Sequence, residues 1–230
     1  MMSSASKIVT LLFGLTFGLL ILFFSNFDKL AQSSQTNHGY VPPAKDQKQQ
    51  KATASGSRGC PGKSVDITSL VPTNHTPTTI STHPNFLFSV KSVPNLPVRF
   101  SLIEPGVIEP LWKSDIAVNR AGILSVSVPQ TVNLDVGKEY VWNLEVVCNP
   151  SRPAENWYIR AVIRRVPLKP ELAQKLAEAS SETEKAVILA NNGIWYDAIA
   201  ISYHSRDEVK ANSYFQQLLA QVGLLSKSNE

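Results

Sequence analysis

The sequence lacks the residue patterns that mark common enzyme families. It has no Gly-x-Ser-x-Gly turn, no His-Glu-x-x-His helix and no glycine loop of the kind that holds phosphate groups. Two cysteines alone cannot make a structural zinc site. The four histidines show no ligand spacing: His38, His75, His83 and His204. We therefore expect no enzymatic activity, no metal and no cofactor.

The part of the chain that we expect to fold has no excess charge. The formal net charge is +4, from 22 basic and 18 acidic residues. Residues 1–59 hold six Lys or Arg against two acids, which leaves 16 of each for residues 60–230. A protein that binds nucleic acid by neutralising phosphates needs a basic face. The balance predicts no nucleic-acid partner.

Long apolar runs are scarce, and one of them lies near the N-terminus. Residues 8–24 are apolar or small and follow Lys7, which is typical of an export signal. As a helix the run would span roughly 26 Å, so it could also remain in a bilayer as an anchor. Cleavage after Ala31 would leave Lys29 where a small residue is favoured. We expect residues 1–31 to be a signal peptide or an N-terminal membrane anchor, and the protein to lie in the periplasm or cell envelope.

Residues 32–59 are polar and contain almost no large aliphatic side chain. Such a segment cannot bury enough apolar surface to offset the entropy lost on ordering. We interpret it as a disordered polar linker, and residues 226–230 as a short tail.

With only two cysteines, the chain can form a single intramolecular disulfide, between Cys60 and Cys148. Export would place both thiols in an oxidising compartment. The bond would close a loop of some ninety residues, which is worth roughly 4.5 kcal/mol by the chain-entropy estimate. We expect it to tie the end of the linker to a sheet.

Residues 60–168 alternate short strand-like runs with Pro, Gly and Asn. The clearest run covers residues 139–148, where apolar side chains recur at every second position. Strands at about ten-residue spacing favour an antiparallel β-sandwich. Residues 134–142, with Gly137 and Tyr140, look like the tyrosine corner of fibronectin type III and immunoglobulin-like sandwiches. There a tyrosine hydroxyl bonds a nearby backbone group.

Residues 169–225 show helical periodicity instead. Pro170 suits a first helical turn, and residues 181–184 read as a capping box for a second helix through Ala190. Gly193 can adopt the left-handed conformation that ends that helix. The fold class that we expect is mostly β with α: an immunoglobulin/fibronectin-III-like sandwich followed by a short C-terminal helical hairpin region.

Two further helices are predicted in the same region. One covers residues 194–203 and the other residues 209–222, for which Ser205 or Asp207 could be the cap.

Residues 193–199 are similar to the junction inside a tetratricopeptide repeat, where two helices pack closely. A solenoid needs about three repeats, so one junction cannot make an array. Trp195, Tyr196 and Asp197 are candidate partner-binding residues. The alternative is that Trp195 packs within the helices and Asp197 is a solvated helix residue.

Several segments together resemble the cyanobacterial domain of unknown function numbered 928. The resemblance covers about residues 58–225 and implies an exported cyanobacterial protein with no assigned activity. Besides the apolar leader, the segments that carry it are residues 59–62, 70–72, 84–88, 137–142, 148–150 and 192–198.

The sequence therefore favours a non-catalytic, exported cell-envelope module that binds an unknown protein or cell-wall partner. The alternative is an envelope glycan-binding protein or hydrolase that uses Trp112 or Trp157 beside acidic residues. Glu104 and Glu109 flank a turn and are the carboxylate pair to consider for hydrolysis of glycosides.

Overall fold

The computed structural model describes residues 39–43, 53–54, 60 and 64–224. The chain divides into two units, Met1–Asn37 and His38–Glu230, and every described residue belongs to the second. The predictions for residues 1–31 and 226–230, and for most of residues 32–59, lie outside the described residues.

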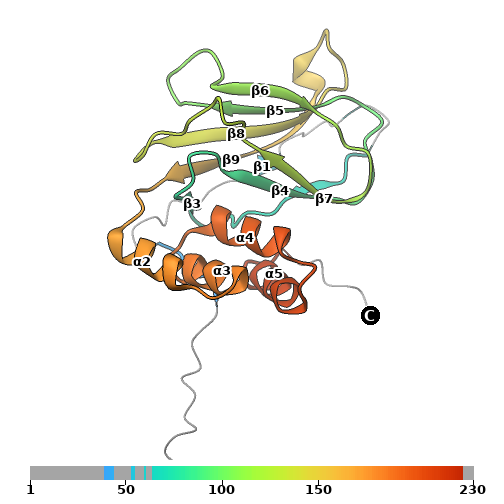
Figure 1. Cartoon of the computed structure of the whole chain (residues 1–230). Coiled ribbons are helices and arrows are strands. Elements are labelled where there is room, and N and C mark those ends of the chain that lie inside the picture. The colour runs from blue at the N-terminus through green and yellow to red at the C-terminus, as the bar shows by residue number, and fades with distance from the viewer. Residues whose placement is uncertain (1–38, 44–52, 55–59, 61–63, 225–230) are drawn as a thin grey trace, which may run out of the picture. The chain divides into compact units, whose positions relative to one another are not determined.

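The larger sheet contains six strands among the described residues (Figure 1). Five are antiparallel neighbours in the order β1-β9-β8-β5-β6, and the short β3 pairs with β9 in parallel. The bounds are β1 Thr53–Ala54, β3 Thr78–Thr79, β5 Val98–Ile103, β6 Trp112–Ile116, β8 Glu139–Val146 and β9 Trp157–Arg165.

The smaller sheet contains three strands in that same described part, in the antiparallel order β2-β4-β7. Their bounds are β2 Ile67–Ser69, β4 Asn85–Val90 and β7 Gly122–Ser127. β2 is shorter than β4 and ends opposite Phe88. The half of β4 that contains Phe86 therefore has a strand partner on the β7 side and lies open to another element on the β2 side.

Aromatic residues from both sheets fill the space between them. The ring of Phe86 lies 4.9 Å from that of Phe100 on β5 and 5.8 Å from that of Trp142 on β8. Phe88 meets Trp142 edge-on at 5.4 Å. Along β8 every second side chain is buried, as predicted from the alternation of residues 139–148. A mostly β chain with two sheets and additional helices is confirmed.

The predicted turn before β8 is also confirmed in its hydrogen bonding. The backbone N–H of Asp135 donates to the hydroxyl of Tyr140 over 2.8 Å. Gly137 has φ +83°, which a residue with a side chain adopts only with strain. This turn fixes where β8 enters the larger sheet.

Four α-helices follow the strands within the described chain, and they lie close to their predicted bounds: α2 Pro170–Glu178, α3 Glu182–Asn191, α4 Trp195–His204 and α5 Val209–Gln221. A short 3-10 helix, η1 Pro153–Glu155, precedes β9.

The helix caps differ from the predictions in two details. Ser181 caps α3 as expected, since its side chain accepts from the N–H of Glu184 at 3.1 Å, but the Glu184 carboxylate accepts from Ser180 instead of from Ser181. The prediction that Ser205 or Asp207 caps α5 is wrong. Glu208 holds that position and its side chain makes no capping hydrogen bond.

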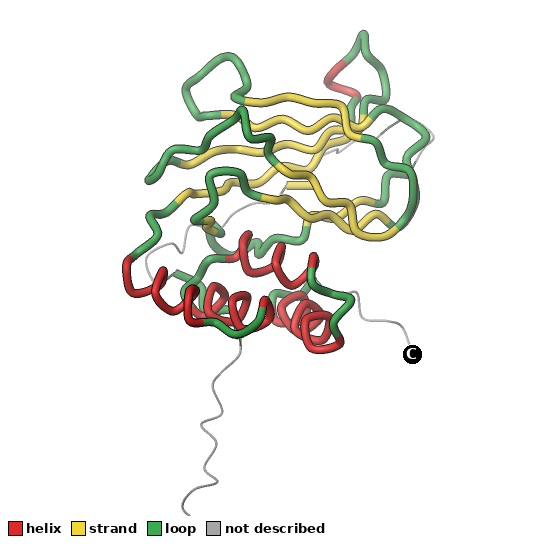
Figure 2. Tube along the Cα trace, in the orientation of Figure 1, coloured by secondary structure: helices red, strands yellow, loops and turns green. Residues whose placement is uncertain are grey.

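The helices form a layer beside the smaller sheet (Figure 2). α4 contacts β3 and β4 directly, and it also contacts α3 and α5. Three consecutive residues of β4, Phe86 to Phe88, are buried, which requires cover on both faces of the strand. The larger sheet covers one face and the helical layer covers the other.

Residues 39–43, which we call the strap, correct part of the linker prediction. Tyr40 is 3% exposed, and the N–H of Val41 donates to the carbonyl of Ala190 over 3.0 Å. The N–H of Tyr40 donates to the side chain of Gln221, which donates back to the Tyr40 carbonyl. Thr53–Ala54 also pairs with β9. For these residues a disordered linker is wrong, because one buried aromatic ring and paired backbone groups hold the chain.

Candidate functional site

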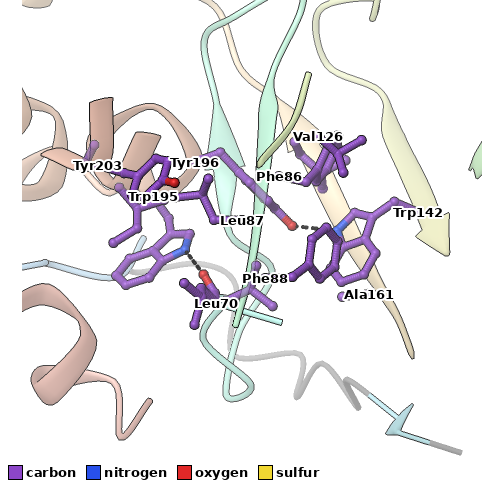
Figure 3. Packing of buried hydrophobic residues seen from close by; sticks show 14 of the residues in the cluster. Leu70, Phe86, Leu87, Phe88, Val126, Trp142, Ala161, Trp195, Tyr196 and Tyr203 are labelled. Atoms are coloured by element: carbon purple, nitrogen blue, oxygen red, sulfur yellow. Dashed lines mark hydrogen bonds between the residues drawn. The ribbon is translucent and has the colours of Figure 1, made fainter. Parts of the chain in front are cut away.

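The first turn of α4 carries Trp195, which is one of the candidate partner-binding residues. Its side chain is 0% exposed. The indole N–H donates to the carbonyl of Leu70 over 3.0 Å (Figure 3). The rings of Trp195 and Tyr40 meet edge to face, with 4.9 Å between their centroids. Trp195 therefore joins three segments that are far apart in the sequence: α4, the loop after β2 and the strap.

Tyr196 reaches from α4 into the space between the two sheets. Its hydroxyl accepts from the indole N–H of Trp142 over 2.8 Å (Figure 3). The same hydroxyl donates to the carbonyl of Val162 over 3.3 Å. Its ring meets Phe86 edge-on at 5.4 Å, beside the half of β4 that β2 leaves open. Burial raises the pKa of Tyr196 above its ordinary value, so this hydroxyl stays protonated.

Asp197 connects the same helix to the loop after β3. Its carboxylate accepts from the hydroxyl of Thr79 at 2.6 Å and from the N–H of Ile80 at 3.2 Å. Burial raises the pKa of Asp197 from 3.8 to about 6, although both hydrogen bonds act in the opposite direction. The side chain is half-buried in the first turn of α4, and its two hydrogen bonds attach this helix to the end of β3.

These contacts correct the prediction of a partner-binding notch at Trp195, Tyr196 and Asp197. Both aromatic rings are buried against the chain's own sheets, so neither offers a surface to another molecule. The alternative is right for Trp195, which packs within the fold, and wrong for Asp197, which is hydrogen-bonded and not fully solvated. Trp195, Tyr196 and Asp197, which lie in the segment that predicted close packing of two helices, attach the helical layer to the sandwich.

A small polar cavity of about 220 Å³ lies beside the strap. The hydroxyl of Tyr40 is 2.6 Å from Nε2 of His75, and Nδ1 of His75 is 2.6 Å from the side-chain oxygen of Asn74. A row of hydrogen bonds from a hydroxyl to a histidine to a third polar group also occurs at catalytic centres, where the histidine acts as a base that activates the hydroxyl. Here burial raises the pKa of Tyr40, and the hydroxyl also contacts the carbonyl of Gly193. These hydrogen bonds hold the strap in place.

The predicted disulfide between Cys60 and Cys148 is present, with 5.1 Å between the two Cα atoms. Cys60 is buried, and Cys148 lies two residues beyond the end of β8. The bond therefore attaches the segment between β1 and β2 to the chain just after β8 of the larger sheet.

The carboxylates considered for hydrolysis lie in ordinary surface positions. Glu104 forms a salt bridge of 2.7 Å with Lys138, which also contacts Asp135 at 3.0 Å. Glu109 is exposed. Within the described residues no group of three or more His, Cys, Asp or Glu side chains is placed to hold a metal ion.

The two tryptophans of the glycan-binding alternative are half-buried. Trp112 packs on Phe100, with 5.3 Å between the ring centroids, and Trp157 packs against the edge of the core. Neither ring lies free on the surface as a flat platform.

An apolar groove of about 400 Å³ lies between α3 and α5, and we call it the α3/α5 groove. Val209 in its wall is 86% exposed. Tyr214 is 5% exposed, and neither its hydroxyl nor the hydroxyl of Thr183 has a hydrogen-bond partner within the described chain. The groove is lined by Thr183, Val187, Val209, Lys210, Ser213, Tyr214 and Gln217.

Sequence reasoning missed both the strap and the α3/α5 groove. A signal for the strap existed, because Tyr40 is an isolated aromatic residue in a polar stretch. The groove had no local signal, since it depends on how two helices are placed around α4.

None of the described helices is both long and apolar enough to cross a membrane, and residues 8–24 lie outside the described part.

The chain was also compared with known proteins. No curated protein matches it. The model of one family matches residues 53–230, which include all the described strands and helices and leave the strap outside. That family carries no assigned activity in its description. Because the match covers most of the chain, the protein belongs to the family described as Domain of Unknown Function (DUF928).

Proposed function

We propose that this protein is a non-catalytic, exported cell-envelope module that binds a protein partner through the α3/α5 groove. The observation that carries the proposal is the groove itself. It combines a large exposed aliphatic side chain, Val209, with a buried hydroxyl on Tyr214 that lacks a partner. Exposed apolar surface and unpaired buried polar groups both cost free energy, and a bound partner removes both costs.

The groove suits an amphipathic helix with a carboxylate beside its apolar face. The helices α3 and α5 contact each other and form the two walls of the groove. Apolar side chains at helical spacing on a partner helix can insert between these walls. Lys210 is the charged residue that lines the groove, and it forms no ion pair within the described chain. An acidic residue of the partner would complement it.

Export is supported by the sequence and by the disulfide. Residues 8–24 form an apolar run after Lys7, and disulfides persist in oxidising compartments outside the cytoplasm.

The scaffold that presents the helices is, on this proposal, an immunoglobulin/fibronectin-III-like sandwich. The hydrogen bond from Asp135 to Tyr140 and the face-to-face packing of two sheets support this assignment.

Site-specific photocrosslinking in native cells tests the groove. A photoreactive amino acid replaces Val209 in the full chain, and as a control it replaces Ile108, which is 96% exposed in the loop between β5 and β6. We expect a protein adduct of one defined mass from position 209 and none of that mass from position 108.

A second variant separates groove binding from chance proximity. Lys210→Glu reverses the charge beside the apolar wall, and it should remove the adduct formed from position 209, because an acidic residue of the partner would then be repelled. The side chain of Lys210 is exposed, so the unfolding midpoint should stay close to that of the parent chain. Equal adducts from positions 209 and 108, or an adduct that persists in Lys210→Glu, would contradict the proposal. A captured protein without an amphipathic acidic segment would contradict the proposed chemistry.

A further inference from the structure

A third cavity, of about 240 Å³, lies where the sandwich meets the helical layer. The loop between β6 and β7 forms one side, and the C-terminal end of α4 with one face of α5 forms the other. It shares no lining residue with the α3/α5 groove. The side chains relevant to binding are Arg120, Tyr203, Arg206, Asn212, Phe215 and Gln216.

The cavity concentrates positive charge. Two guanidinium groups, from Arg120 and Arg206, line it, and no Asp or Glu does. Neither arginine forms an ion pair within the described chain, although Asp207 and Glu208 follow Arg206 in the sequence. Residues 60–230 carry equal numbers of basic and acidic residues, so this local excess is not a consequence of general composition.

One of the two guanidinium groups is held in position. Arg206 lies over the ring of Tyr203 at 4.0 Å from the centroid, and its Nη1 donates to the Tyr203 carbonyl over 2.9 Å. Tyr203 is itself attached to the sandwich, since its hydroxyl donates to the carbonyl of Ile123 over 3.2 Å. A guanidinium fixed by stacking loses less side-chain entropy when it binds an anion through its remaining N–H groups.

The rest of the cavity provides polar donors and open space. Asn212 and Gln216 are four residues apart on α5 and therefore share one face of that helix. Phe215 lies beside them and packs against Tyr203, with 5.7 Å between the ring centroids. Gly122 has no atom within 4 Å of where a Cβ would stand, so the cavity is open at the sandwich side.

We infer that this cavity binds the oxyanion group of a small organic anion, such as the carboxylate of a sugar acid. The arginine fork matches both carboxylate and phosphate, and the volume admits a single sugar-sized group. The exposed amides of Asn212 and Gln216 favour an organic anion over an inorganic one, because they can bond sugar hydroxyl groups beside the oxyanion.

Calorimetric titration of the full chain in mild detergent tests the inference. The probes are glucuronate, inorganic phosphate and neutral glucose, and the variants are Arg120→Gln, Arg206→Gln and Arg160→Gln. Arg160 is the matched control, since it is also exposed and stacks near a tyrosine ring, at 5.9 Å from the centroid of Tyr158, but does not line the cavity. Thermal unfolding of each variant shows that it is folded.

We expect saturable binding of glucuronate with a Kd of about 1 mM or lower, weakening as salt is added. Loss of either cavity arginine should weaken it about tenfold or more, while Arg160→Gln leaves it unchanged. Phosphate binding at least as tight as that of glucuronate would assign the site to a phosphate group and overturn the carboxylate. No saturable binding of either anion, equal binding of glucose, or equal affinity in all three variants would overturn the inference.

Discussion

At the residue scale, aromatic and acidic side chains that could bind a partner protein can instead attach one part of the same chain to another. Trp195, Tyr196 and Asp197 are the most distinctive residues of the helical region, and all three contact the chain's own sheets or strap. Their spacing predicted close packing correctly. It could not identify the packing partners, because those of Tyr196, which are Phe86, Trp142 and Val162, lie on three strands that are 34 to 110 residues away in the sequence.

Asp197 gives the fold a specific dependence on pH. Its pKa is about 6 in the folded chain against 3.8 for the free side chain, so the folded state binds the proton more tightly. Asp197 therefore adds to the free energy of unfolding at low pH, and this contribution is lost as pH rises through about 6. The free energy of unfolding falls by at most about 1.4 kcal/mol per pH unit because of this group.

Urea unfolding of the wild-type chain and of Asp197→Asn measures this effect. The variant has no ionisable group at the site, so other titrating groups cancel in the difference between the two free energies of unfolding. We expect that difference to shift in favour of the wild-type chain as pH falls from 7 to 4.5. Parallel curves across this range would show that Asp197 does not titrate as described.

At the scale of elements, the helices were predicted and the strap was missed. Helical periodicity and Ser181 are local signals, and α3 begins and ends close to the predicted residues. The cap of α5 was predicted wrongly. Ser205 and Asp207 are good capping residues just before this helix, but the N-cap position is held by Glu208. The strap depends on Ala190, Gly193 and Gln221, which lie about 150 to 180 residues from it.

Gly193 tests the packing of the strap. Its φ is +77°, and a Cβ there would lie 3.1 Å from the carbonyl oxygen of Val41 and 3.1 Å from Pro43. Gly223 is a matched control with φ +73° and nothing within 4 Å. Both Gly→Ala variants incur the left-handed strain of about 1–2 kcal/mol, but only Gly193→Ala also displaces the strap.

Hydrogen exchange reports the difference directly. The amide of Val41, which bonds to Ala190, should lose protection in Gly193→Ala and keep it in Gly223→Ala. Gly193→Ala should also unfold at lower urea than Gly223→Ala. Equal protection of Val41 in both variants would mean that the strap does not pack on Gly193.

At the scale of the whole molecule, alternation along strands was enough to predict two packed sheets, and the presence of only two cysteines was enough to predict the disulfide between Cys60 and Cys148. The candidate surfaces were beyond reach of the sequence. The α3/α5 groove and the arginine cavity both arise where separate segments meet, and residues such as Arg120 and Arg206 look like ordinary surface charges when the chain is read in order.

We propose above all that the chain works outside the cytoplasm, as an envelope module closed by a disulfide. Native cells are fractionated without reductant, free thiols are alkylated at once, and the chain is analysed by mass spectrometry. We expect it in the envelope fraction with Cys60 and Cys148 joined and neither one alkylated. Recovery from the soluble cytosol with both cysteines alkylated would contradict the claim.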